Sequence, residues 1–305
     1  MSQLRALACP ASLKGVLRAS AAADALAAGL RAAGVETDVM PVADGGEGTL
    51  DVLGGGTRAY QVEDAFGRPR EAWAGALPDG AVVIEAAQAI PFDPDRLDVM
   101  AASSRGLGLW IERLRDCPLV VAVGGTATMD GGAGLLEVLH SLPGPTRVLS
   151  DVSTRLNDAP RLYGPQKGAS PEQVAELEAR FRAMESLLPF ADLPGSGAAG
   201  GLGAALASLG AELLPGADAV LELLGFDPTP YDLVITGEGT VDRTTWEGKA
   251  PAVVARRCRE AGARCVVFGG RVVGGDAVAL SGDPSRARDD LVQLGRKLGG
   301  LLGGA

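Results

Sequence analysis

The chain is poor in the residues on which several common kinds of site depend. It contains one histidine, His140, so neither a histidine-based metal centre nor a serine–histidine triad is expected. Its four cysteines stand at positions 9, 117, 258 and 265 without a short paired spacing, which predicts reduced thiols in a cytoplasmic protein. Aromatic residues make up 4% of the chain and leave few rings for stacking against nucleic-acid bases.

Long apolar runs and positive charge are also scarce. No apolar run approaches the roughly 18 residues of a membrane-spanning helix, and the formal net charge is −10. A negative field of this size repels nucleic acid and anionic membranes, so neither is predicted as a partner. Phosphorylated small molecules are repelled as well. Any anion site must therefore be built locally from backbone N–H groups, helix N-termini and a few lysines.

Short apolar runs alternate with longer helical runs along most of the chain. Continuous apolar strands between helices indicate a parallel sheet covered on both faces, and hence an α/β fold. The expected strands are 4–9, 35–43, 119–123, 233–236 and 265–268, and the expected helices are 18–33, 135–140, 251–261 and 284–298. The glycine-rich tail, 299–305, is expected to be frayed.

Two stretches break this alternation and predict a second domain. Residues 71–87 have the pattern of a hairpin around Pro78-Asp79-Gly80, and a strand over 147–152 precedes a helix opened by a capping box from Ser170 to Gln173. A chain of 305 residues is long enough for two domains. We predict a discontinuous α/β domain formed by 1–61, 102–139 and 195–305, with a second α/β domain, formed by 62–101 and 140–194, inserted into it.

Glycine is abundant, at 44 residues, and the excess gathers in five loops that carry acidic or hydroxyl side chains. The loops are 44–49, 124–134, 164–168, 195–203 and 237–242, and three of them follow predicted strands. Open parallel sheets bind ligands at the carboxyl ends of their strands, and glycine lets backbone N–H groups approach phosphate oxygens closely. The loops therefore predict a phosphate site.

The charged residues of these loops indicate the chemistry. Acidic side chains fit a phosphate site if Mg²⁺ bridges them to the phosphate, or if one of them accepts a proton from a substrate hydroxyl. Lys14, Lys167 and Lys249 each stand next to a glycine and could supply positive charge to a transferring phosphoryl group. Together these features predict magnesium-dependent phosphate chemistry.

Two other phosphate-binding patterns are less consistent with the sequence. Gly195, Gly197 and Gly200 have the spacing of the dinucleotide-binding fingerprint, but no strand precedes them, which argues against a nicotinamide-dependent oxidoreductase. The G-x-x-x-x-G-K-[ST] pattern of P-loop enzymes does not occur in the sequence.

The loops lie in motifs that resemble those of bacterial-type glycerate kinases. In chain order they are SLKG at 12–15, PVADGGEGT at 41–49, GGTATMDGGAG at 124–134, YGPQKGA at 163–169, GAAGGLG at 197–203 and TGEGTVD at 236–242, followed by Gly248-Lys249. They stand in the family's order over roughly residues 8–255. The resemblance implies a cytoplasmic kinase that transfers phosphate from ATP, with Mg²⁺, to D-glycerate and yields 2-phosphoglycerate or 3-phosphoglycerate.

The resemblance also implies a fold and a site. It implies two different α/β domains, one of them flavodoxin-like, with the active site in the cleft between them, in a monomer or a homodimer. The charged residues expected at the site are Lys14, Asp44, Glu47, Asp130, Lys167, Glu238, Asp242 and Lys249, and the loop residues expected to bind substrate or phosphate are Gly45, Gly46, Gly124, Gly125 and Thr126.

Roles within this set follow from charge. Asp44 and Asp130 are candidates for general base or metal ligand, and Asp151 is a further candidate ligand. Lys14 and Lys167 are candidates for binding the substrate carboxylate or the phosphates, and Lys14 is expected, with Asp44 and Asp130, among the catalytic residues.

The chain departs from the family pattern at several places. Ala11 stands where the family has an acidic residue, residues 153–156 have lost an Asn-Pro pair, and both the segment between His140 and Arg147 and the C-terminal part are short. These departures favour an alternative, in which a kinase-like paralogue acts on another small hydroxy acid or only binds a nucleotide as a regulator.

Overall fold

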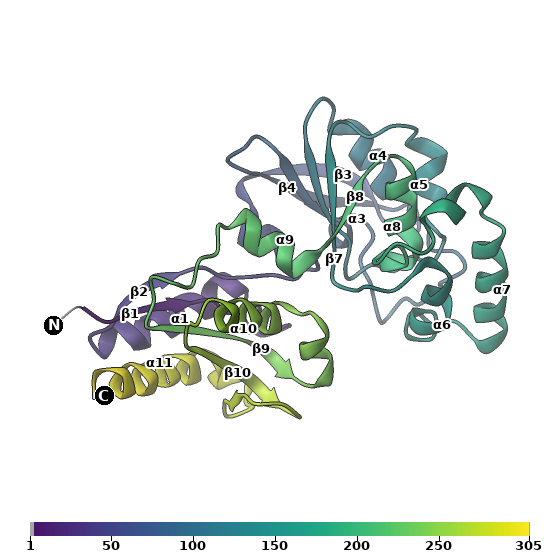
Figure 1. Cartoon of the computed structure of the whole chain (residues 1–305). Coiled ribbons are helices and arrows are strands. Elements are labelled where there is room, and N and C mark those ends of the chain that lie inside the picture. The colour runs from purple at the N-terminus through teal and green to yellow at the C-terminus, as the bar shows by residue number, and fades with distance from the viewer. Residues whose placement is uncertain (1–2, 305) are drawn as a thin grey trace. The chain divides into compact units, whose positions relative to one another are not determined.

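The computed structural model describes residues 3–304, which divide into two compact units. Among these residues, unit 1 consists of 3–43 and 220–304, and unit 2 consists of 44–219 (Figure 1). The prediction of an α/β chain with one domain inserted into another is therefore confirmed. The units divide the chain at places that differ from the predicted boundaries, because the whole stretch from 44 to 219 is built around one sheet.

Unit 1 contains a five-stranded sheet in which every neighbouring pair of strands is parallel. Its strands are β1 (Arg5–Ala8), β2 (Glu36–Val39), β9 (Leu233–Val241), β10 (Cys265–Val272) and β11 (Val278–Ala279). They lie in the order β11-β10-β9-β1-β2. Numbered within this unit, the order is the 2-1-3-4-5 of flavodoxin-like sheets, and the direction of succession reverses between β1 and β9. The predicted flavodoxin-like domain is thus confirmed.

Small residues set the packing of the helices in unit 1. Its helices are α1 (Ala19–Ala32), α10 (Ala250–Glu260) and α11 (Ala287–Gly303), with α9 (Gly216–Leu223) at the junction with unit 2. Helices α1 and α11 lie side by side (Figure 1). They meet at Gly29 and Gly295, where a Cβ on Gly295 would stand 2.3 Å from the carbonyl oxygen of Leu26. The prediction of a frayed tail from residue 299 is wrong, because α11 continues to Gly303 and Gly299 is buried.

We expect Gly295→Ala to lower the free energy of unfolding by about 1–3 kcal/mol, because the new methyl group would overlap the backbone of α1. Gly300 lies in the same helix, and a Cβ there would meet no atom of the described residues within 4 Å. Gly300→Ala should therefore raise stability by up to about 1 kcal/mol through helix propensity. Urea unfolding of both variants measures the contrast, and stabilisation by both substitutions would contradict the close crossing.

Unit 2 is built on a six-stranded mixed sheet in the order β3-β4-β5-β6-β7-β8. The strands are β3 (Gly55–Glu63), β4 (Pro69–Ala76), β5 (Val82–Glu85), β6 (Leu119–Ala122), β7 (Thr146–Ser150) and β8 (Glu212–Pro215). Strands β3, β4 and β5 are antiparallel neighbours, whereas β5 to β8 are parallel. The hairpin predicted around Pro78-Asp79-Gly80 is confirmed by β4 and β5, which pair Ala74 with Ile84.

One strand belongs to a different sheet from the one predicted. The run 119–123 was expected in the sheet of 4–9, but β6 pairs with β5 and β7 inside unit 2. All four residues of β6 are buried. A strand buried on both faces has the same continuous apolar pattern in either sheet, so the pattern cannot assign it.

Short helices cover the sheet of unit 2 and carry the loops that bear polar side chains. They are α2 (Thr49–Leu53), α3 (Ala86–Ala89), α4 (Arg105–Arg113), α5 (Ala133–Val138), α6 (Ala159–Tyr163), α7 (Pro171–Arg182) and α8 (Ala198–Ser208). Helix α7 begins with the predicted capping box, in which Ser170 Oγ accepts from the N–H of Gln173 and the Gln173 side chain accepts from the N–H of Ser170. Within residues 3–304, no helix is both long and apolar enough to cross a bilayer.

Candidate functional site

The structure gathers the predicted site residues into two groups, one in each unit. The β9 cluster, in unit 1, consists of Lys14, Glu238, Asp242 and Lys249. The glycine-loop cluster, in unit 2, consists of Asp44, Gly45, Gly46, Glu47, Gly124, Gly125, Thr126, Asp130, Asp151 and Lys167.

The β9 cluster lies at the carboxyl ends of β1 and β9, where the strand order of unit 1 reverses. The chain after β1 runs along β9, since the N–H of Ala11 donates to the carbonyl of Gly237 at 2.8 Å. A Cβ on Gly239 would stand 3.3 Å from the backbone nitrogen of Lys14. Glycine at 239 therefore lets the Lys14 loop lie directly against the strand, at the position where sheets of this order bind ligands.

Glu238 joins β9 to the segment that follows it. Its Oε1 accepts a hydrogen bond from Thr245 Oγ1 at 2.6 Å, and its Oε2 lies 3.7 Å from Lys249 Nζ. The Lys249 side chain is one-third exposed, so the ion pair leaves part of the ammonium group open to solvent.

Asp242 fixes the turn η4 (Arg243–Glu247) by capping it. Its Oδ1 accepts from the N–H and Oγ1 of Thr244 at 2.8 and 2.6 Å and from the N–H of Thr245 at 3.3 Å. The hydrogen bond from the Thr244 hydroxyl is the main cause that holds the pKa of Asp242 below its usual value. These contacts give Asp242 the task of shaping the segment between Glu238 and Lys249.

The glycine-loop cluster forms where two loops meet at the carboxyl ends of β6 and β7. A Cβ on Gly124 would stand 2.8 Å from the Cα of Gly46 and 2.9 Å from Asp151 Oδ2. A Cβ on Gly46 would stand 3.3 Å from Asp44 Oδ1 and 3.8 Å from Asp151 Oδ2. The carboxylates of Asp44 and Asp151 therefore converge on two glycines, of which Gly124 has no room for a side chain and Gly46 has little.

Lys167 brings a buried positive charge to this cluster. Its side chain is 7% exposed, and its Nζ donates to the carbonyl of Thr128 at 2.8 Å. Burial lowers the pKa of Lys167 to about 8, although the charges of Asp130 and Asp151 act in the opposite direction. At neutral pH the group is still an ammonium ion, and it lies beside carboxylates that favour this charged form.

The carboxylate of Asp130 accepts hydrogen bonds from backbone N–H groups and from a hydroxyl group. Its Oδ2 accepts from Ser104 N at 2.8 Å, Ser104 Oγ at 2.8 Å and Gly134 N at 3.2 Å, and its Oδ1 accepts from Gly132 N at 3.0 Å. Ser104 and Gly132 are the residues that precede α4 and α5. A carboxylate at two helix N-termini is electrostatically favourable, so Asp130 ties the starts of both helices together.

We expect Asp130→Asn to lower the free energy of unfolding by about 1–3 kcal/mol, because an amide cannot accept all four of these hydrogen bonds. Asp44 provides the matched control, since its Oδ1 accepts one hydrogen bond, from Gly46 N at 3.2 Å. Urea unfolding should show a clearly smaller loss for Asp44→Asn. Equal losses in the two variants would show that Asp130 does not anchor the helices.

Glu85 is a functional candidate that the sequence did not reveal. It ends β5 and is 4% exposed, and its Oε1 accepts from the N–H groups of Gly48 and Leu50 at 2.9 and 2.7 Å. Burial raises the pKa of Glu85, and the charge of Glu47 adds to the rise. The Glu85 carboxylate thereby holds the turn that carries Gly46 and Glu47. No loop motif marks it, because it lies at the end of an ordinary apolar strand.

Thr126 offers the cluster a hydroxyl group. Its side chain is 3% exposed, and its Oγ1 has no hydrogen-bond partner among residues 3–304. Buried hydroxyl groups are almost always hydrogen-bonded, so an unpaired one in a glycine-rich loop marks a place where a ligand could accept or donate. The preceding residue, Gly125, is exposed and has a φ of +77°, a backbone angle that favours glycine.

The donor groups of the cluster allow one mode of binding a divalent metal ion. Within the described part of the chain, no group of three His, Cys, Asp or Glu residues could hold a metal ion by itself. Asp44 and Asp151 nevertheless flank the same glycines. Mg²⁺ is commonly held by one or two carboxylates together with substrate phosphates and water, and this pair fits that mode of binding.

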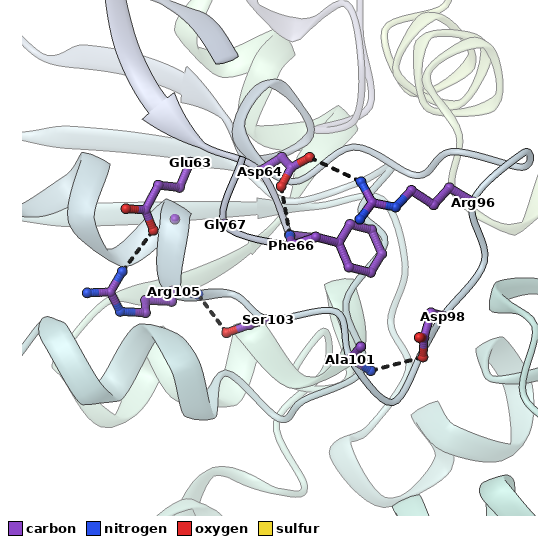
Figure 2. Close-up of a pocket in the computed structure, with 11 residues that line it drawn as sticks. Glu63, Asp64, Phe66, Gly67, Arg96, Asp98, Ala101, Ser103 and Arg105 are labelled. Atoms are coloured by element: carbon purple, nitrogen blue, oxygen red, sulfur yellow. Dashed lines mark hydrogen bonds and ion pairs between the residues drawn. The ribbon is translucent and has the colours of Figure 1, made fainter. Parts of the chain in front are cut away.

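A pocket of about 630 Å³ lies elsewhere in unit 2, and none of the predicted site residues line it. Its two arginines are paired, because Arg105 Nη1 lies 2.8 Å from Glu63 Oε2, and Arg96 lies 3.7 Å from Asp64 and 3.8 Å above the centre of the Phe66 ring (Figure 2). Asp98 is a third acidic residue of the lining, so the acidic groups outnumber the basic ones and the pocket does not favour an anion.

Comparison with known sequences gives one consistent result. The sequence profile of the glycerate kinase family matches residues 6–141 and 145–284. The chain is 32% identical to a glycerate 2-kinase of Escherichia coli K12 over an alignment of 309 positions, gaps included, that covers 83% of this chain and 81% of that protein. It is also 32% identical to a glycerate kinase of Bacillus subtilis 168 over an alignment of 313 positions that covers 84% of this chain and 82% of that protein.

Comparison with solved structures agrees. A crystal structure from Salmonella typhimurium LT2, of a protein assigned as glycerate kinase 2, superposes with a TM-score of 0.83 and 27% sequence identity. The match covers 99% of both chains.

Proposed function

The chain belongs to the glycerate kinase family, and on this premise we propose that it transfers the γ-phosphate of ATP to D-glycerate. We further propose 2-phosphoglycerate as the product, which the name of the Escherichia coli relative supports. The observation that carries the proposal is the buried ammonium group of Lys167, which lies among acid-bearing glycine loops at the ends of parallel strands.

Lys167 and Thr126 bind the anionic acceptor in this proposal. Glycerate carries a carboxylate that must be drawn into a protein of net charge −10. A buried ammonium group attracts an anion far more strongly than an exposed one, because the surrounding dielectric constant is low. The unpaired hydroxyl of Thr126 gains a partner when the substrate is bound.

Asp44 is the general base of the proposed reaction. The hydroxyl oxygen of glycerate attacks the γ-phosphorus, the bond to the β-γ bridging oxygen breaks, and the hydroxyl proton passes to Asp44. Asp44 suits this task better than Asp130, because Asp44 Oδ1 accepts one hydrogen bond whereas Asp130 accepts four. Asp130 and Glu85 instead hold the loops on which the reacting groups lie.

Mg²⁺ is the metal implied by this chemistry, and Asp151 would hold it together with the phosphates and water. When bound, Mg²⁺ neutralises charge on the transferring phosphoryl group. In unit 1, Lys14 and Lys249 of the β9 cluster would bind the nucleotide phosphates as point charges. The four cysteines are free thiols, which supports a reducing compartment such as the cytoplasm.

The proposal is tested by following ADP release in the presence of ATP, Mg²⁺ and D-glycerate. We expect turnover on the order of 1–100 per second, none without D-glycerate, and none when EDTA removes the metal. Release of ADP at the same rate without glycerate would indicate an ATPase and would reject the proposal.

The second candidate is a kinase-like paralogue that acts on another small hydroxy acid or only binds a nucleotide as a regulator, and one observation favours it. Ala11 is bonded through its N–H to Gly237, so the place where the family has an acidic residue lies beside the β9 cluster. Loss of that acid would change the charge that a ligand meets there. Assays with glycolate, lactate and L-glycerate in place of D-glycerate distinguish the candidates, since faster turnover of one of these acids would reassign the substrate.

A further inference from the structure

An exposed tryptophan lies in the turn that joins two members of the β9 cluster along the chain. Trp246 belongs to η4, between Asp242 and Lys249, and 40% of its surface is exposed. The turn that carries it is fixed from two sides, by the Asp242 cap and by the hydrogen bond from Thr245 to Glu238. Trp246 therefore exposes a large apolar side chain on a turn that hydrogen bonds hold in place, three residues before Lys249.

Gly275 supports the indole of Trp246. A Cβ on Gly275 would stand 2.2 Å from Trp246 Nε1 and 2.8 Å from Cε2, so the ring packs directly on the glycine backbone. Gly275 lies in the segment that follows β10. This segment begins alongside β9, since the N–H of Val273 donates to the carbonyl of Val241. The segment that follows β10 therefore supports the ring.

We propose that Trp246 is the stacking platform for the purine base of the nucleotide, and that unit 1 is the nucleotide-binding unit. Sheets with the strand order of unit 1 bind nucleotide-like cofactors where the order reverses, and the Lys14 loop and Glu238 lie at that point. Lys14 and Lys249 supply the cations that a polyphosphate requires. Trp246 stands three residues before Lys249, on a turn that Thr245 bonds to Glu238, and an aromatic ring on that turn suits a base. A ligand with both parts is a purine nucleoside di- or triphosphate.

This inference rests on the proposed use of ATP, but it is tested by binding rather than by turnover. Calorimetric titration with Mg-ADP measures binding of base and phosphates together, and titration with inorganic tripolyphosphate measures binding of phosphates alone. Trp246→Ala should weaken ADP binding by about five- to hundredfold, the range found when a base loses its aromatic partner. Its affinity for tripolyphosphate should change less than about twofold. Trp246→Phe should retain most of the ADP affinity, because phenylalanine keeps a ring.

Trp73 provides the matched control. It lies on β4 in unit 2, and its exposure, 41%, is almost the same as that of Trp246. Trp73→Ala should leave ADP affinity unchanged. Stacking of a base on Trp246 should also quench its fluorescence, and this quenching should disappear in Trp246→Phe and persist in Trp73→Phe.

Several outcomes would overturn the inference. Equal weakening of ADP and tripolyphosphate in Trp246→Ala would show a general disturbance of the β9 cluster, and unchanged ADP affinity would show that the ring does not meet the base. A wild-type protein that binds no ADP rejects both the inference and the proposed function. A wild-type protein that binds ADP through Trp246 but does not phosphorylate glycerate rejects only the proposed function.

Discussion

Lys167→Met is expected to lower kcat/KM for glycerate phosphorylation by on the order of 10²–10³-fold. Methionine has nearly the same length and fills the buried site but carries no charge. The variant therefore loses the cation that we propose to attract the acceptor anion, as well as the hydrogen bond to Thr128. Steady-state kinetics with D-glycerate as the varied substrate measures the loss.

The pH dependence of the wild-type enzyme reports the same group. Lys167 is charged below its pKa of about 8 and neutral above it. The value of kcat/KM should therefore fall as the pH rises through about 8. Lys167→Arg keeps its charge at every pH of the assay, so the alkaline limb should disappear in this variant even if its activity is lower. An alkaline limb of the same shape in Lys167→Arg would assign the titration to another group.

Stability provides a second readout for Lys167. Its pKa is about 8 in the folded protein and 10.5 in its ordinary state, so the unfolded chain binds more protons between these values. The free energy of unfolding of the wild type, relative to Lys167→Met, should therefore rise with pH from about 8 to about 10.5. The full rise is about 3 kcal/mol. A flat difference over this window would show that Lys167 is not desolvated.

Asp44→Asn is expected to lower kcat by on the order of 10²–10⁴-fold, the contribution of a positioned general base. Asparagine preserves the shape of the side chain and the acceptor for Gly46 N but cannot accept the substrate proton. The fold should stay intact, so the thermal unfolding curve should be close to that of the wild type. Single-turnover kinetics separates the chemical step from substrate binding.

Asp130 and Asp24 show whether this loss is specific to Asp44. Asp24 is exposed on α1 of unit 1, and Asp24→Asn should leave kcat unchanged. Asp130→Asn should lose stability first, through the starts of α4 and α5. If Asp130→Asn were as stable as the wild type and as inactive as expected for Asp44→Asn, the base would have to be reassigned to Asp130.

Local sequence patterns were sufficient for most of the elements. Continuous apolar runs located β1, β9 and β10, and the capping box located the start of α7. Such signals act within a few residues, so they survive any tertiary arrangement. The family motifs then implied the flavodoxin-like strand order, which no local pattern encodes.

The sequence misled where long-range packing decides. The apolar run of β6 fits either sheet, and only its pairing with β5 and β7 places it in unit 2. The glycines at the end of α11 have the composition of a frayed tail, yet Gly299 is buried. A Cβ on Gly299 would stand 2.7 Å from the Cβ of Ala33, the residue that follows α1. Glycine composition records flexibility of the isolated chain and does not reveal a close helix crossing.

The predicted site residues were easier to name than to assign. The motifs identified Asp44, Asp130 and Lys167 as site residues, but charge alone could not show which aspartate is a base and which one anchors a helix. The hydrogen bonds of Asp130 favour the helix anchor. They come from Ser104, 26 residues before it, and from residues up to Gly134, four residues after it, and only the folded structure brings these donors together. Glu85 and Trp246 escaped notice, because neither stands among the glycines that drew attention to the loops.

The most direct test of the central claim is a phosphorus NMR spectrum of the protein incubated with ATP, Mg²⁺ and D-glycerate. We predict that the γ-phosphate resonance of ATP is replaced by one phosphomonoester resonance, split into a doublet by the single proton on C2 of 2-phosphoglycerate. A triplet would move the phosphate to the 3-hydroxyl. Inorganic phosphate alone, or an unchanged ATP spectrum, would contradict the claim that this chain phosphorylates glycerate.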